Sequence, residues 1–200
     1  VIRKRGSTRR FAQDPISQAQ FEAILAGSSR GSPSDFHGKD GESLVDMYTI
    51  VHAVDGVPAG SYYFDPQTSK LVLLREGDLR ARAGHLCFEQ ALGADASAVT
   101  FFMADLEAIF QQYGNRGYRA AQLEAGIVGG KMYLCAHSLG LGATGMTFYD
   151  DEVAEFFSPH AEGESLMFLV AVGVVGRPNR VRPFRSQIAV TLDALARGAS

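Results

Sequence analysis

The segment 118–140 (YRAAQLEAGIVGGKMYLCAHSLG) constrains the fold of this chain more than any other. Its apolar residues recur on nearly every side of a helix, which predicts a central and largely buried helix. Gly126, Gly129 and Gly130 lie inside it, although each glycine costs a helix roughly 1 kcal/mol relative to alanine. We therefore expect the backbone of this helix to approach a partner helix or a ligand closely at these glycines.

Short strand patterns on both sides of this helix predict an α+β fold, with helices on a mostly antiparallel sheet. Turn residues at Asp55-Gly56 and over 65–69 join the first three strands as an antiparallel meander. The predicted strands are 46–54, 60–64, 70–75, 97–104, 142–148 and 165–175. The predicted helices are one that a capping box of Ser17 and Gln20 begins, 79–92 capped by Asp78, 106–113, 118–140, and one capped by Asp150 or Asp151.

One domain over residues 1–200 accounts for the whole chain, because 46% hydrophobic and 20% charged residues is ordinary globular composition. Neither a long apolar run nor a signal peptide is found, so the sequence predicts a soluble, cytoplasmic protein that does not enter a membrane. Val1 stands where a methionine would begin a chain, and we expect a domain processed or excised from a longer protein.

Two basic clusters bracket an acidic body. Residues 1–10 carry five basic side chains and residues 177–185 carry four, with no acidic residue in either stretch. The formal charge of the whole chain is nevertheless −3. A nucleic-acid-binding domain usually has a broad basic face, so the charge pattern argues against nucleic acid as a partner.

The first basic cluster carries the donors that a phosphate group requires. Arg5 and Arg9 supply guanidinium groups, Ser7 a hydroxyl, and Gly6 an unhindered backbone N–H. Alone, such a segment is more often a solvated tail. The second cluster, which contains Arg180 and Arg182, follows the last predicted strand and strengthens the hypothesis that both clusters meet one phosphate.

Residues 140–145 (GLGATG) match the letters of the dinucleotide-binding pattern G-x-G-x-x-G. That pattern must follow a strand and open a helix, because the pyrophosphate lies at the helix N-terminus. Here the helix precedes the glycines and a strand follows, which argues against a Rossmann site. Two interpretations remain open: a plain helix stop, or a turn whose exposed backbone N–H groups donate to a ligand.

The remaining reactive residues indicate no metal site and no hydrolase. The five histidines and two cysteines have no metal-ligand spacing, and we expect Cys87 and Cys135 to be buried thiols. His137 is expected to be a core histidine with a hydrogen-bond partner. Glu124 lies on the same predicted helix, where a buried carboxylate needs a partner, and a structural role is favoured over a role in a site.

Five motifs in chain order resemble the nitroreductase family of FMN-dependent oxidoreductases, and more narrowly its SagB-type dehydrogenase branch. The resemblance extends from Arg5 to about Arg185. The motifs are the R-x-S-x-R-x-F opening over 5–11, the Pro33-Ser34 loop, the stretch YGNRGYRAAQLEAG over 113–126, the turn GLGATG over 140–145, and the basic pair Arg180 and Arg182.

The resemblance implies a three-layer α+β sandwich that forms a homodimer, with FMN bound at the interface. It also implies NAD(P)H as the reductant and a ping-pong cycle in which hydride passes through flavin N5. The backbone of 142–145 is expected near the N5 edge. The implied cofactor-binding residues are Arg5, Gly6, Ser7, Arg9, Pro33, Ser34, Gly142, Ala143, Thr144, Gly145, Arg180 and Arg182.

Tyr113 is the candidate catalytic residue, as a side chain that lines the substrate pocket. Azoline dehydrogenases of the branch resemble one another in a Lys-Tyr pair at this point, whereas this chain has Gln112 before Tyr113. A neutral amide cannot accept a proton, so azole formation is disfavoured.

The substrate stays open among nitroaromatics, quinones, enones and peptide heterocycles. The alternative function is a catalytically idle flavin-binding or scaffold domain.

Overall fold

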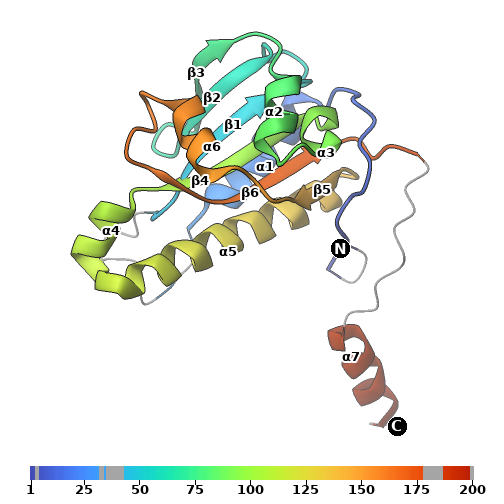
Figure 1. Cartoon of the computed structure of the whole chain (residues 1–200). Helices are drawn as coiled ribbons and strands as arrows, with labels where there is room; N and C mark the ends of the chain where they lie inside the picture. The colour runs from blue at the N-terminus through green and yellow to red at the C-terminus, as the bar shows by residue number, and fades with distance from the viewer. Residues whose placement is uncertain (3–4, 32–33, 35–42, 178–186, 199–200) are drawn as a thin grey trace.

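The strands of this chain form one antiparallel sheet, as the turn residues predict. The computed structural model describes residues 1–2, 5–31, 34, 43–177 and 187–198, and in these residues the sheet has six strands in the order β3-β2-β1-β4-β6-β5 (Figure 1). Each neighbouring pair is antiparallel. The strands are β1 (Asp46–Val51), β2 (Gly60–Asp65), β3 (Lys70–Glu76), β4 (Ala98–Ala104), β5 (Gly142–Gly145) and β6 (Ser165–Gly173).

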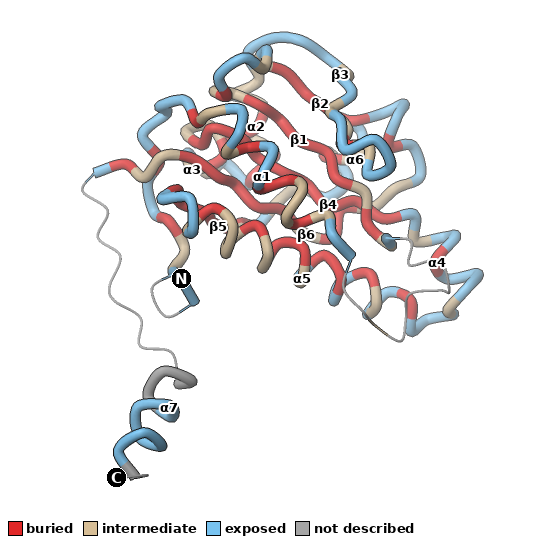
Figure 2. The backbone as a smooth tube through the Cα atoms, turned by 180° about the vertical axis from the view of Figure 1, so that it is seen from behind, coloured by how far each residue is buried: buried red, intermediate tan, exposed pale blue. Residues whose placement is uncertain are grey.

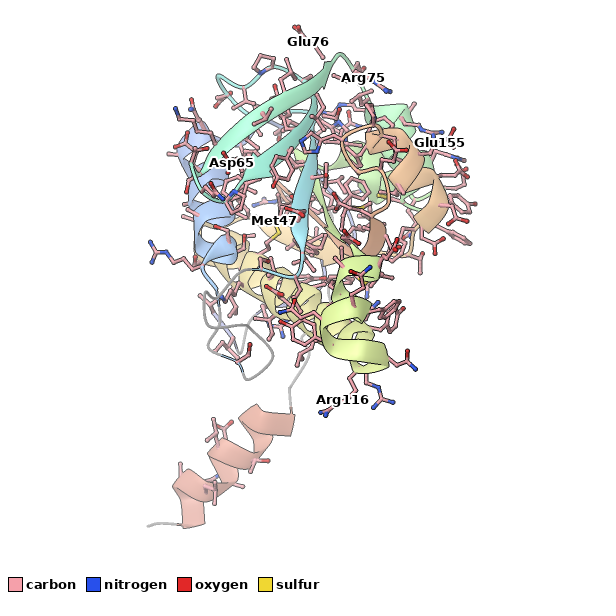
Figure 3. The ribbon with its side chains drawn as sticks, turned by 90° about the vertical axis from the view of Figure 1, so that its left-hand side faces the viewer. Met47, Asp65, Arg75, Glu76, Arg116 and Glu155 are labelled. Atoms are coloured by element: carbon pink, nitrogen blue, oxygen red, sulfur yellow. The ribbon has the colours of Figure 1, made fainter. Side chains whose placement is uncertain are left out.

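Helices cover both faces of this sheet, which confirms the three-layer sandwich. Figures 1 and 3 show α1 and α5 on one face and α2, α3 and α6 on the other. The helices are α1 (Gln18–Ser29), α2 (Arg80–Leu86), α3 (Ala91–Asp95), α4 (Leu106–Tyr113), α5 (Gly117–Ser138), α6 (Asp150–Phe157) and α7 (Gln187–Gly198), with a 3-10 turn at Gly114–Arg116. The C-terminal helix α7 was not among the predicted elements.

Each layer of helices has its own hydrophobic core against the sheet. Successive side chains of a strand point to opposite faces, so Phe102 of β4 packs toward α1 and α5 while its neighbour Phe101 packs toward α6. Every residue of β4 is buried. The tube in Figure 2 is correspondingly buried along the central strands and along one side of α5.

The glycines of α5 divide into two kinds. A Cβ at Gly129 would lie 2.8 Å from the Phe168 ring of β6, so this glycine permits the predicted close approach. Gly126 and Gly130 meet nothing within 4 Å among the described residues, and Leu123 is 55% exposed. The prediction of burial on nearly every side is therefore wrong for one face, because α5 is an outer layer with only its inner side on the sheet.

The predicted helix 79–92 is two helices. The chain turns between α2 and α3, where Phe88 and Glu89 have φ of 60° and 57°. This turn folds α3 back on α2, so that a Cβ at Gly93 would lie 2.8 Å from the Ala83 carbonyl oxygen. A continuous helix would hold residues 83 and 93 about 15 Å apart. The contact at Gly93 therefore requires the break.

Several predicted boundaries extend too far. Regular strand pairing ends at Val51, Gly145 and Gly173, with only isolated bridges at Val54 and Val175, so β1, β5 and β6 are shorter than predicted. Tyr149 is the N-cap residue of α6, without a side-chain cap bond, so the predicted cap at Asp150 or Asp151 is wrong. The capping box of Ser17 and Gln20 is confirmed. Among the described residues, no helix is both long enough and apolar enough to cross a membrane.

Candidate functional site

The N-terminal segment lies along β5 and the end of β6. The Thr8 N–H donates to the Ala143 carbonyl of β5 at 2.9 Å. Further along, Phe11 forms an antiparallel bridge with Val175, and the Gly176 N–H donates to the Arg10 carbonyl at 2.8 Å. The first basic cluster is thereby anchored where β6 ends and the second basic cluster begins.

Tyr133 of α5 joins the N-terminal segment to β5. Its hydroxyl lies 3.2 Å from Ser7 Oγ and accepts a hydrogen bond from the Gly145 N–H at 2.5 Å. The Arg5 guanidinium lies over the Tyr133 ring, 5.7 Å from its centroid. The opening motif over 5–11 and the turn over 140–145, well over a hundred residues apart in the sequence, therefore meet at the phenol of Tyr133. The sequence analysis did not single out this tyrosine.

His137, one turn after Tyr133, anchors the same segment. Its Nε2 lies 3.0 Å from the Gly6 carbonyl oxygen, and because a carbonyl only accepts, Nε2 carries the hydrogen. The prediction that His137 has a hydrogen-bond partner in the protein is confirmed. Beside it, Thr8 is buried against Gly142, where a Cβ would overlap Thr8 Oγ1.

Two positively charged groups at this place are free to meet a ligand. Arg5 and Arg9 are exposed, and neither has a carboxylate partner in the part of the chain that the structure describes. The Ser34 hydroxyl oxygen is buried and has no hydrogen-bond partner among the described residues. The other predicted site residues, Pro33, Arg180 and Arg182, lie outside the described residues.

Glu124 has the predicted structural role. Its side chain is 5% exposed, and its two oxygens accept from Ser43 Oγ at 2.8 Å and from the Leu44 N–H at 2.7 Å. These bonds fix the chain to α5 just before β1 begins.

Tyr113 ends α4 and is half-buried against the core on the α1 and α5 face. Within one chain it lies at the opposite end of α5 from Tyr133, and sixteen residues of helix from Gly117 to Tyr133 span about 24 Å. Figure 1 shows α4 at that far end, and Figure 3 labels Arg116 there. Within one chain, Tyr113 therefore lies far from the first basic cluster.

Three other aromatic residues that could stack in a pocket beside Tyr113 are spread over the molecule. Phe110 and Tyr118 are exposed, and Phe148 packs on the opposite face of the sheet. Cys87 is buried, which raises the pKa of its thiol to about 12, whereas Cys135 is only half-buried.

A second polar cluster, which the sequence did not reveal, lies around the start of β1. The Tyr48 hydroxyl donates to Glu164 Oε1 at 2.7 Å and lies 2.9 Å from His160 Nδ1. Glu164 Oε2 is buried without a partner among the described residues. Burial, together with the charges of Asp46 and Asp105, raises the pKa of Glu164 to about 7, against a smaller opposite effect of the Tyr48 hydrogen bond.

The sequence profile of the Nitroreductase family matches residues 2–174. The chain belongs to the nitroreductase family. The match covers all six strands, the N-terminal segment and α5, so the site described above lies inside the family's domain.

Relatives of known sequence or structure agree with this assignment. A protein named as a nitroreductase from Methanocaldococcus jannaschii is 29% identical over 161 residues, which cover 78% of this chain and 81% of the relative. The crystal structure of a nitroreductase from Anabaena variabilis is 29% identical with a TM-score of 0.77 and covers 86% of this chain. This chain spans only 37% of the length of that protein.

A more distant solved structure has the same fold. The NADPH:FMN oxidoreductase from Vibrio harveyi, solved in complex with NAD⁺, is 17% identical with a TM-score of 0.64. The likeness covers 94% of this chain and 73% of that protein.

Proposed function

We propose that this nitroreductase-family chain is an FMN-dependent oxidoreductase that takes hydride from NAD(P)H and delivers it to a small-molecule or peptide-derived substrate. The observation that carries the proposal is the meeting of Arg5, Ser7 and Gly145 around Tyr133. The family and the Vibrio relative, whose name includes both NADPH and FMN, support the choice of cofactor and donor. No observation favours the scaffold alternative.

The donors at this place fit a phosphorylated flavin. Arg5 and Arg9 supply charge-assisted donors for a dianionic phosphate, and the Ser7 hydroxyl adds a short hydrogen bond. Ser34, in the loop between α1 and β1, has a buried hydroxyl without a partner among the described residues, and we include it in the proposed set because of the resemblance. Pro33, Arg180 and Arg182 complete the proposed set from the sequence.

When bound, FMN supplies the acceptance and donation of hydride. The residues of this chain have the tasks of binding, orientation and exclusion of water. In this proposal Arg5, Gly6, Ser7 and Arg9 hold the phosphate end. Gly142, Ala143, Thr144 and Gly145 place strand backbone beside the ring, and Tyr113 lines the substrate pocket.

The substrate class follows the branch that the motifs indicate. The stretch over 113–126 supports SagB-type chemistry on a ring or on a peptide-derived group. Gln112 supplies no base for removing a ring proton, so we propose reduction of a conjugated or nitro-bearing acceptor ahead of azoline oxidation.

Anaerobic mixing of the FMN-loaded protein with NADH or NADPH tests the function directly. We expect the visible flavin absorption to bleach within seconds and to return when a quinone or a nitroaromatic is added. Initial rates against both substrates should give the parallel lines of a ping-pong cycle. A protein that takes up no FMN contradicts the proposal, and bound flavin that neither donor bleaches supports the scaffold instead.

Arg5→Ala is expected to weaken FMN binding about tenfold, the usual effect of losing one charge-assisted phosphate contact. Arg10→Ala is the matched control, because Arg10 is also exposed on the same segment but follows the proposed contact residues. Titration monitored by quenching of flavin fluorescence measures both. Equal, small effects of the two substitutions would contradict the phosphate assignment.

We also propose that the chain forms a homodimer through the outer face of α5. That face carries exposed Leu123 with the bare backbone of Gly126 and Gly130, while Phe110 and Tyr118 are exposed near its start. Exposed apolar residues gathered on α5 and the end of the adjoining α4 mark an interaction surface. Bare glycines let a second backbone approach closely.

Leu123→Lys is expected to shift the protein from dimer to monomer, since it places a charge on this face. Leu73→Lys on the edge strand β3 is the control, because Leu73 is similarly exposed but lies at the far side of the sheet. Light scattering after size exclusion measures the mass. A wild-type monomer, or a Leu123→Lys dimer as stable as that of the control, would refute the interface.

A further inference from the structure

We propose that Tyr133 is a positioning residue of the flavin site, which holds the phosphate-side segment and the ring-side strand β5 in one fixed relation. The inference deepens the proposed function and rests on it. It assigns a task to a residue that no sequence motif indicated.

The hydroxyl of Tyr133 lies at the junction of the two parts. It accepts from the Gly145 N–H at 2.5 Å and shares a hydrogen bond with Ser7 Oγ at 3.2 Å. Ser7 belongs to the proposed phosphate contacts and Gly145 to the strand proposed beside the ring. Among the described side chains, the phenol is thus the one group that is hydrogen-bonded to both Ser7 and Gly145.

Packing brings the phenol to this junction. The Phe168 ring lies against two glycines, because a Cβ would come within 2.8 Å of it at Gly129 and within 2.6 Å at Gly145. The two missing side chains let α5 and β5 approach closely. Tyr133 is one helical turn beyond Gly129, so its side chain projects from the same face toward β5.

The same helical face holds the segment at a second point. His137, one further turn along, bonds to the Gly6 carbonyl at 3.0 Å. The Arg5 guanidinium lies over the Tyr133 ring at 5.7 Å. Residues 5–7 are therefore fixed on α5 by three contacts. The Tyr133 hydroxyl connects this position to Gly145, while the neighbouring Thr8 N–H bonds to β5 directly at Ala143.

The Tyr133 hydroxyl also occupies the Gly145 N–H as a hydrogen-bond donor. In this structure the N–H donates to Tyr133, so it does not donate to a flavin ring at the same time. Removing the phenol oxygen releases this donor beside the proposed ring position. We therefore expect Tyr133 to influence how strongly the site distinguishes oxidised from reduced flavin, in addition to how tightly it binds.

The test is a double-mutant cycle of Tyr133→Phe and Ser7→Ala on FMN affinity, with both oxidised and chemically reduced FMN as probes. Tyr133→Phe should weaken binding of oxidised FMN about tenfold and change the ratio of the two affinities by about threefold or more. Ser7→Ala should cost much less in the Tyr133→Phe background than in wild type. Tyr62→Phe, which also loses a hydroxyl bonded within the fold, should change neither quantity.

The possible outcomes separate the positioning role of Tyr133 from the proposed function. Additive effects, or Tyr133→Phe binding FMN as wild type does, overturn the positioning role while the proposed function stands. A wild-type protein that binds no FMN overturns both. If Tyr133→Phe does not fold, Ser7→Ala alone decides: a changed ratio of affinities supports the link through Tyr133, and an unchanged ratio refutes it. Arg5→Ala, on the phosphate side, should leave that ratio unchanged.

Discussion

Gly142→Ala is expected to lower the free energy of unfolding by about 2–3 kcal/mol and to weaken FMN binding by at least about tenfold. The added Cβ would overlap Thr8 Oγ1 and lie 2.9 Å from Val175 Cγ2. Thr8 is 1% exposed and its N–H is bonded to Ala143, so it cannot move aside without leaving β5. Movement of Thr8 would displace Ser7 and Gly6 from the proposed site.

Thr8→Ala provides the matched rescue. It removes both Thr8 atoms that the new Cβ would meet, so the double variant should regain part of the stability and part of the FMN affinity lost in Gly142→Ala. Urea unfolding of the flavin-free protein gives the first quantity, and fluorescence titration gives the second. No rescue in either measurement would show that the collision with Thr8 is not the cause.

Wild-type stability is expected to decline by about 2 kcal/mol, relative to Glu164→Gln, as the pH rises from 4.5 through 7. Folding raises the pKa of Glu164 from 4.5 to about 7, chiefly through burial. Because the Glu164 residue is only half-buried, solvent screening reduces the effect to roughly half of what the full shift implies. Glutamine resembles the protonated acid, which should make the variant insensitive to this titration.

The sign follows from where the proton is held. Below pH 4.5 the carboxyl is protonated in both states, and between 4.5 and 7 the folded state holds a proton that the unfolded state has released. The stabilisation is fully present below the unfolded pKa and is lost as the pH rises through the folded pKa. The groups facing this carboxyl are Tyr48 and Asp46 of β1, Tyr63 of β2, Asp105 before α4, and His160 after α6.

His52 contributes with the opposite sign. Burial, helped by Arg80, lowers the pKa of His52 from 6.5 to about 4, so its stabilisation is present above pH 6.5 and is lost as the pH falls toward 4. The two effects oppose each other in the wild type. Unfolding free energies of wild type and Glu164→Gln, measured side by side from pH 4 to 8, isolate Glu164 by subtraction. Parallel profiles would show that Glu164 does not titrate in this window.

The architecture was predictable because alternation and turn residues act locally. Asp55-Gly56 and the turn over 65–69 correctly join the first strands, and the apolar pattern of 118–140 locates α5 within two residues. The break at Phe88 and Glu89 was not predictable from propensity. It depends on the packing of Gly93 on Ala83, a contact that exists only once α2 and α3 have folded together.

The residue types of the candidate site were predictable from the sequence. The contact through Tyr133 that joins them was not. The residue types at Arg5, Ser7 and Arg9 indicate a phosphate because that chemistry is local. Tyr133 carries no such signal, because a tyrosine on an apolar helix is usually a core residue. Its importance comes from its two hydrogen-bond partners: Ser7, which is 126 positions before it, and Gly145, which is 12 positions after it.

The pairing of residues 10–12 with residues 174–176 has a consequence for the order of events during synthesis. Residues 10–12 are synthesised long before residues 174–176, and contacts of such large sequence separation form late. A chain truncated before residue 174 lacks the partners of residues 10–12, although residues 5–8 can still contact α5 and β5. We expect a truncated chain to hold the proposed phosphate-side segment less firmly, and so to bind FMN more weakly than the whole domain.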